Sequence, residues 1–229
     1  LFISFCVGYF FVMGTSQWLA AFFMRSHGMQ AGELGAWLAL SWGVCGLLGN
    51  YLGGYWATRY AASREKLQMR AMVFIYILYG LLTVMVYLSP SQYVALAFLA
   101  ASALAGTLIN GPLFAAIQSL VNERMRSVTI ALIFLFANLI GLGLGPLALG
   151  VLSDLLNPAF GQESLRYALA LSCSGTLWVA VHFWKTANTI EEDIRQVESA
   201  AGSVETEATT IETDTPKLNN ASSWNLGKS

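Results

Sequence analysis

The chain has 229 residues, of which 56% are apolar and 11% are charged, and its formal net charge is −1. Because soluble domains carry about 25% charged residues, this composition excludes an ordinary water-soluble enzyme or DNA-binding module. The net charge also conceals two regions of opposite sign: residues 1–187 hold nine basic and five acidic residues, a balance of +4, whereas residues 188–229 hold three and eight, a balance of −5. Neither region has the large basic patch that a nucleic acid partner requires.

Long stretches of the chain contain no charged side chain. Residues 71–122 and 127–153, which are 52 and 27 residues long, include no Asp, Glu, Lys, Arg or His. A helix needs about 20 apolar residues to cross the hydrocarbon layer, and no stretch alternates as a barrel strand does. The sequence therefore predicts an all-α, multi-pass membrane protein, with residues 1–187 as one bundle of six transmembrane helices. These spans are expected at about residues 1–24, 34–57, 71–89, 92–121, 128–152 and 165–184.

The first predicted span begins at Leu1, without a methionine or a basic leader. A signal peptide would have a charged start, a short apolar core and a cleavage site, whereas this apolar run continues past Phe23. We therefore expect the chain to be a fragment of a longer protein. Within the span, Gln17 would be costly in lipid without a hydrogen bond, so it is expected to face the bundle or a cavity.

The second predicted span is rich in glycine toward its end. Gly49 and Gly53 have the small-xxx-small spacing that lets two helix backbones approach closely in a membrane. The following stretch resembles the short cytoplasmic loop motif of the major facilitator superfamily, G-x-x-x-D-R-x-G-R. Gly54 and Arg59 match, and Arg64 is one of the further basic residues that trail the motif, while Thr58 stands at the acidic position and Ala61 at the second glycine.

Proline interrupts the fourth and fifth predicted spans. Pro112 frees the carbonyl four residues earlier, and irregular backbone at membrane depth is tolerated only inside protein or beside a water-filled cavity. Asn110 is therefore expected to face the interior, either to bond another helix or to contact a substrate. The fifth span joins Asn138 to a segment that either bends during transport or forms a fixed kink. That segment contains Gly141, Gly143, Gly145 and Pro146.

The loops and the tail indicate the orientation of the chain. Ten Lys and Arg residues lie on the side that includes the C-terminus, and the other side has only Arg25 and Arg166. The positive-inside rule makes the ten-residue side cytoplasmic, in a plasma membrane or, for a prokaryote, the inner membrane. Residues 188–229 have too few apolar side chains to offset the entropy of ordering. We predict an acidic, disordered cytoplasmic tail, in which Thr189–Ser199 could extend the last helix.

Several short stretches together resemble the Spinster-like branch of the major facilitator superfamily. They are Arg25-Ser26-His27-Gly28-Met29, Gly32-Glu33-Leu34-Gly35, Leu52-Gly53-Gly54, Glu123-Arg124-Met125-Arg126, Asn138 through Pro146 and Ser164-Leu165-Arg166-Tyr167-Ala168-Leu169. The resemblance covers about residues 10–185. Members of that family have twelve helices in two six-helix halves, and this chain corresponds to the last six.

The resemblance implies a fold, a partner and a site. The fold is the C-terminal bundle of a carrier whose central cavity opens alternately to each side of the bilayer, and the partner is the N-terminal half, which this chain lacks. The first, second, fourth and fifth spans would line the cavity from this half. The polar and aromatic candidates in those spans are Gln17, Trp18, Trp42, Asn110 and Asn138.

The sequence shows no recognisable motif for catalysis, metal binding or cofactor binding. The stretch Gly14-Thr15-Ser16-Gln17-Trp18 is the nearest approach to the G-x-S-x-G of an intramembrane protease, and it lacks the second glycine. The three cysteines lie in separate spans without a CxxC pair, which argues against zinc. Ion coupling usually requires an ionisable side chain inside a span, so any titrating group is expected in the absent half.

Two functions therefore stay open. The first is a secondary active transporter that moves a small or amphipathic, lipid-like organic solute across the bilayer by alternating access. The second is a non-transporting membrane scaffold or sensor whose acidic tail binds a partner.

Overall fold

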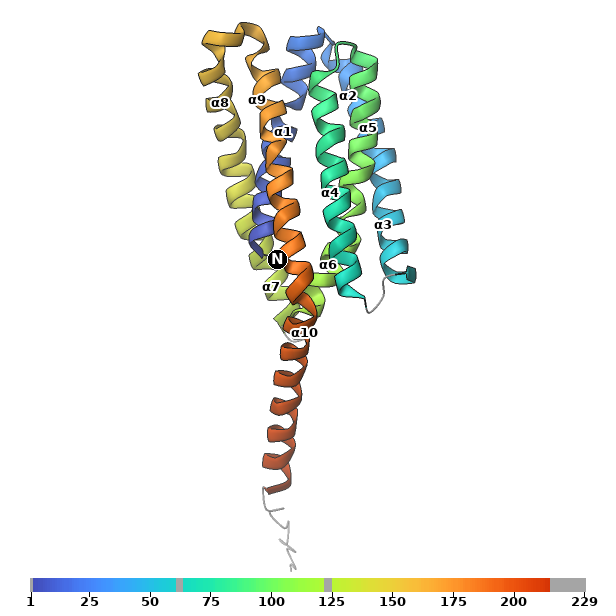
Figure 1. The fold of residues 1–229 in the computed structure, drawn as a ribbon, viewed down its shortest axis with the longest axis vertical. Coiled ribbons are helices and arrows are strands. Elements are labelled where there is room, and N and C mark those ends of the chain that lie inside the picture. The colour runs from blue at the N-terminus through green and yellow to red at the C-terminus, as the bar shows by residue number, and fades with distance from the viewer. Residues whose placement is uncertain (1, 61–63, 122–124, 215–229) are drawn as a thin grey trace, which may run out of the picture.

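The computed structural model describes residues 2–60, 64–121 and 125–214. All elements in these ranges are helical, and they run up and down one elongated bundle (Figure 1). In chain order they are α1 (Phe2–His27), α2 (Ala31–Ala39), η1 (Leu40–Cys45), α3 (Gly46–Tyr60), α4 (Glu65–Leu88), α5 (Gln92–Leu108), α6 (Asn110–Ser119), α7 (Arg126–Asn138), η3 (Leu139–Leu144), α8 (Gly145–Phe160), η4 (Gly161–Glu163), α9 (Ser164–Ser172) and α10 (Ser174–Asp214).

These elements group into six spans. Five continuous apolar stretches are long enough to cross a membrane, and the last of them, Arg126–Gln196, turns back on itself at η4. Gly161 makes this turn possible because its φ of +53° lies in the left-handed region that favours glycine. The all-α fold and the six membrane-spanning segments predicted from hydropathy are thereby confirmed.

The two ends of the bundle differ in charge. The end of α3 and the starts of α4 and α7 lie at the end of the bundle from which α10 projects, while the α1–α2, α4–α5 and α8–α9 connections lie at the opposite end (Figure 1). Arg59 in the last turn of α3, Arg64 just before α4 and Arg126 at the start of α7 therefore share one end. Arg25 and Arg166 belong to the other end, near the close of α1 and the start of α9.

Two apolar clusters form the core, one toward each end. The first contains Phe22 and Phe23 of α1 packed with Leu165 and Leu169 of α9. The second gathers around Phe183 of α10 and includes side chains from α1, α4 and α6. On α1 the two clusters are separated by several turns, and the middle of the bundle is where the side chains leave a cavity.

Glycines let helix backbones meet at two crossings. On α3, a Cβ at Gly49 or Gly53 would run into the carbonyl oxygen of Leu104 or of Leu108 on α5. Pro112 has no N–H and cannot donate a hydrogen bond to the Leu108 carbonyl. Gly53 of α3 packs against this carbonyl oxygen instead, as small residues do at other helix crossings in membranes.

The second crossing joins the fifth span to α1. A Cβ at Gly145 would lie 2.7 Å from the Phe10 carbonyl oxygen, and one at Gly141 would lie 2.7 Å from Cδ1 of Tyr9. Gly143 has nothing within 4 Å of its Cβ position. The segment forms a π-helical turn, η3, before Pro146 occupies the first turn of α8, where its missing N–H costs little.

The C-terminal region differs from the sequence-based expectation. Beyond the predicted bundle of residues 1–187, Ile190 is still buried in the second apolar cluster. The same helix, α10, then continues to Asp214 where the composition predicts disorder. Residues 215–229 of the expected tail lie outside the described residues.

Candidate functional site

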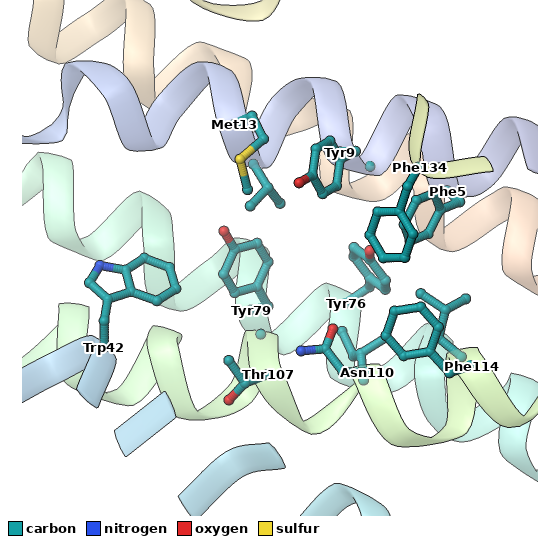
Figure 2. A pocket seen from close by; sticks show the side chains of 15 residues that line it. Phe5, Tyr9, Met13, Trp42, Tyr76, Tyr79, Thr107, Asn110, Phe114 and Phe134 are labelled. Atoms are coloured by element: carbon teal, nitrogen blue, oxygen red, sulfur yellow. The ribbon is translucent and has the colours of Figure 1, made fainter. Parts of the chain in front are cut away.

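A cavity of about 360 Å³ lies in the middle of the bundle. Five of the six spans line it, through α1, η1, α4, α5 with α6, and α7. Figure 2 shows Tyr9 and Met13 pointing from α1 toward Tyr79 and Asn110 on the opposite wall. The complete lining is Phe5, Gly8, Tyr9, Val12, Met13, Trp42, Tyr76, Tyr79, Gly106, Thr107, Ile109, Asn110, Leu113, Phe114 and Phe134.

Asn110, the first residue of α6 after the break that ends α5, is held by a hydrogen bond to α3. Its Nδ2 donates to Oδ1 of Asn50 at 2.9 Å, and Nδ2 of Asn50 donates to the Gly46 carbonyl at 3.0 Å. The bond to Asn50 uses one of the two N–H groups of the Asn110 amide and fixes the orientation of that amide, whose carbonyl oxygen can accept a hydrogen bond from a ligand. The sequence left open whether Asn110 bonds another helix or contacts a substrate. In the structure it bonds Asn50 of α3 and also lines the cavity.

Tyr9 and Asn138 form a second polar pair, between α1 and the end of α7. The Tyr9 hydroxyl donates to Oδ1 of Asn138 at 3.4 Å, and Nδ2 of Asn138 donates to the Phe134 carbonyl at 2.8 Å. Asn138 itself does not line the cavity but positions Tyr9, which does. The Tyr9 oxygen keeps its lone pairs for a donor from the ligand.

Two tyrosines of α4 stand against glycines of neighbouring helices. The Tyr76 hydroxyl lies 3.0 Å from the place where Gly8 would carry a Cβ, and the Tyr79 ring lies 3.0 Å from the corresponding place at Gly106. Their spacing of three residues puts both on one side of α4. Glycine on α1 and α5 therefore makes the room that these aromatic rings occupy.

The two ends of the cavity differ. Phe5, Phe114 and Phe134 gather at one end, with an edge-to-face contact at 5.8 Å between Phe5 and Phe134 and a stacked contact at 5.7 Å between Phe114 and Phe134 (Figure 2). Trp42 closes the other end and is 42% exposed. It belongs to η1, a π-helical turn, an irregularity that is frequent at functional sites.

The chemistry of the lining is neutral and aromatic. The described lining residues include no Asp, Glu, Lys, Arg or His, and in the described ranges no three His, Cys, Asp or Glu residues gather as a metal site would require. Hydroxyl, carboxamide and indole groups orient a ligand by hydrogen bonding, while phenyl and phenol rings bury its apolar part.

Of the five residues proposed from the sequence to line the cavity, some do so in the structure and others lie elsewhere. Trp42 and Asn110 line the cavity, and Asn138 lies one hydrogen bond behind it. Trp18 instead donates from Nε1 to the Pro146 carbonyl at 2.9 Å and joins the first span to the fifth. Gln17 is exposed on the surface of the bundle and is not among the lining residues.

The residues of the loop motif lie at the charged end of the bundle. Gly54 lies where α3 meets α6, since a Cβ at Gly111 would be 2.8 Å from the Gly54 nitrogen. Arg59 and Arg64 are exposed on either side of the α3–α4 connection. Thr58, at the acidic position of the motif, donates to the carbonyl of Gly54 at 3.0 Å. Ala61 lies outside the described residues.

Sequence reasoning missed the tyrosines and Asn50. Tyr76 and Tyr79 were detectable, because two phenols three residues apart share one face of an otherwise apolar helix. Tyr9 and Asn50 carried no local signal of this kind. Their importance comes from partners that lie 129 and 60 residues away in the sequence.

Comparison with known proteins identifies the fold. No protein-family model matches the chain. Over 175 residues, or 76% of its length, the chain is 32% identical to an MFS-type efflux pump of Mycolicibacterium smegmatis (strain ATCC 700084 / mc(2)155), of which it spans 41%.

Two crystal structures of a bacterial homolog to the human lysosomal transporter Spinster are also similar. The inward-facing, unoccupied conformation has a TM-score of 0.67 at 20% identity, with 84% of this chain and 48% of that chain covered. The inward-facing, occupied conformation has a TM-score of 0.62 at 20% identity, with coverages of 84% and 49%. The chain thus spans about half the length of the proteins that it matches. The chain is thus similar to part of a transporter of the major facilitator superfamily, and its bundle has the fold of one six-helix half of a Spinster-like transporter.

Proposed function

We propose that this chain is the C-terminal half of a secondary transporter, which moves a small or amphipathic organic solute by alternating access. The observation that carries the proposal is the cavity in the middle of the bundle, about 360 Å³ in volume and lined from five spans by aromatic rings and neutral polar groups. The likeness to an efflux pump and to a Spinster homolog supports the same function.

The second half of the carrier would cover the least buried face of this one. Only 17% of the second span is buried, against 39% of the first, third and fourth. Asn50 and Gln17 are exposed within spans, and amide side chains are costly against lipid. They therefore favour contact with a second bundle or with a water-filled cavity over contact with acyl chains.

The basic end of the bundle would face the cytoplasm. Arg59, Arg64 and Arg126 lie at that end, which by the positive-inside rule is the cytoplasmic side. The carrier would then lie in a plasma membrane, or in the inner membrane of a bacterium, with α10 extending into the cytoplasm.

Flux through the full-length carrier in vesicles tests the proposal. With a solute that the wild type transports, Asn110→Ala should raise KM by roughly 2- to 10-fold, as expected for the loss of one hydrogen bond worth about 0.5–1.5 kcal/mol. Asn50→Ala is the matched control, because it removes the same bond between helices without removing a cavity group. Equal KM values in wild type and Asn110→Ala would contradict this assignment of the cavity.

The alternative function is a scaffold or sensor that transports nothing and binds a partner through its acidic C-terminal region. One observation favours it: α10 extends past the bundle to Asp214. Absence of flux for every member of a broad solute panel, with the full-length protein correctly inserted, would favour this second function over the first.

A further inference from the structure

The last helix, α10, keeps the same spacing of apolar residues after it leaves the bundle. Inside the bundle, Phe183, Ala187 and Ile190 of α10 are buried in the second apolar cluster, and Ile194 packs against its edge. Beyond these residues α10 continues to Asp214 and extends past every other labelled helix in Figure 1. A helix that continues into water after its packing partners end requires a reason other than the core of this bundle.

The sequence of that extension repeats every seven residues. Apolar residues follow Ala187 at alternating intervals of three and four. They are Ile190, Ile194, Val197, Ala201, Val204, Ala208 and Ile211. This is the a/d pattern of a coiled coil, sustained over three heptads on one continuous helix. Its first members are the residues that pack inside the bundle, so the register of the core continues into the extension.

The acidic residues follow the same register. With Ile194 at position a and Ile190 at position d, the e positions are all glutamate and the g positions are acidic except for one alanine. They are Glu191, Glu198, Glu205 and Glu212 at e, and Asp193, Ala200, Glu207 and Asp214 at g. Seven of the eight acidic residues between 188 and 214 therefore fall at e or g positions of the heptad. The remaining heptad positions carry mostly Ser, Thr and Gly, with Arg195 as the basic residue of this segment.

This arrangement opposes pairing between two copies of the chain. In a parallel coiled coil each g position meets an e position of the partner, and in an antiparallel one e meets e and g meets g. Either orientation places carboxylates against carboxylates, which repel. The same charges oppose docking of the stripe onto a membrane with anionic lipids.

We propose that the extension of α10, residues 194–214, is a docking site for a basic amphipathic helix of another protein. That helix would have apolar residues at its own a and d positions and Lys or Arg at e and g, so that the five acidic residues at the e and g positions of this segment each face a cation. The extension projects past the other labelled helices (Figure 1), and none of the described residues that line the cavity belongs to it.

Binding of a synthetic peptide to the full-length protein in neutral-lipid nanodiscs tests the proposal. The basic peptide matches the length of the extension, with Ile or Leu at a and d and Lys at e and g, and an acidic peptide replaces each Lys with Glu. Fluorescence anisotropy, corrected for empty nanodiscs, should detect the basic peptide and not the acidic one. Added salt should weaken the binding, because the flanking charges are screened.

Paired substitutions separate the heptad from simple charge attraction. Val197→Asp with Val204→Asp changes two d positions, and Ser203→Asp with Thr210→Asp changes two c positions at the same spacing. Both pairs add two negative charges, so charge attraction alone would strengthen binding in both. We expect the d pair to weaken binding at least about tenfold, or 1.4 kcal/mol, while the c pair leaves it within about twofold.

A charge exchange keeps the test decisive if the d pair unfolds the helix, which circular dichroism would reveal. Glu198→Lys, Glu205→Lys and Glu212→Lys together should transfer the preference to the acidic peptide. Equal binding of both peptides, an unchanged affinity in the d pair with its helix retained, or an unchanged preference after the charge exchange would overturn the proposal. Self-association of the full-length protein that the d pair abolishes would also overturn it, because the occupant would then be a second copy.

Discussion

Alanine at position 53 would test whether the α3–α5 crossing depends on direct contact between backbones. A Cβ at Gly53 would lie 2.8 Å from the carbonyl carbon and 3.0 Å from the Cα of Leu108, and still nearer the carbonyl oxygen. Ordinary contacts of a Cβ are 3.4–4 Å, and the obstacle is backbone, so the helices would have to move apart. Overpacking of this kind typically costs roughly 1–3 kcal/mol.

The neighbouring glycine supplies the control. A Cβ at Gly54 would have nothing within 4 Å, and both substitutions gain the same helix propensity, roughly 1 kcal/mol for alanine over glycine. The difference between Gly53→Ala and Gly54→Ala therefore isolates the steric cost, and we expect Gly53→Ala to be less stable by roughly 1–3 kcal/mol. Unfolding of the full-length protein in mixed detergent–SDS micelles would measure it. Equal stability of the two variants would refute the close approach of α3 to Leu108.

Three further substitutions test other contacts by the same unfolding measurement. Gly141→Ala should destabilise the protein by roughly 1–3 kcal/mol, because its Cβ would meet the backbone and a ring of α1. Gly143→Ala, whose Cβ would face open space, should be neutral or stabilising. A larger loss of stability in Gly143→Ala than in Gly141→Ala would contradict the packing of η3 against α1. Trp18→Phe removes the hydrogen bond to the Pro146 carbonyl and should cost about 0.5–1.5 kcal/mol, so an unchanged stability would show that this bond contributes nothing. Phe183→Ala empties a fully buried site and should cost roughly 3–5 kcal/mol; a loss below about 1 kcal/mol would show that the second apolar cluster is not tightly packed.

The membrane fold was predictable because its cause is local in the sequence. Hydropathy, the charge-free stretches and the loop charges act on each segment separately, so the number of spans and the shared end of Arg59, Arg64 and Arg126 needed no tertiary information. The ends of the helices were less accurate. The sequence analysis allowed Thr189–Ser199 to extend the last helix, whereas α10 continues to Asp214.

The cavity was only half predictable, for a physical reason. In a soluble helix the apolar face indicates the core, but in a membrane lipid and protein interior are both apolar, so composition does not indicate how a span is rotated. Gln17 and Met13 lie one turn apart on α1, yet Met13 lines the cavity and Gln17 is exposed. Residues four apart lie on nearly the same face of a helix, so these two differ mainly in their position along α1, and only the tertiary structure shows that the cavity lies beside Met13.

The sequence by itself determined that this protein crosses a membrane six times, that its two ends differ in charge and that its last residues are acidic, because each property is a sum over neighbouring residues. Only the tertiary structure decided which side chains meet. The bond from Asn110 to Asn50 and the bond from Tyr9 to Asn138 join residues from different spans. These pairs depend on where glycine lets two backbones approach, and that depends on the packing of the whole bundle.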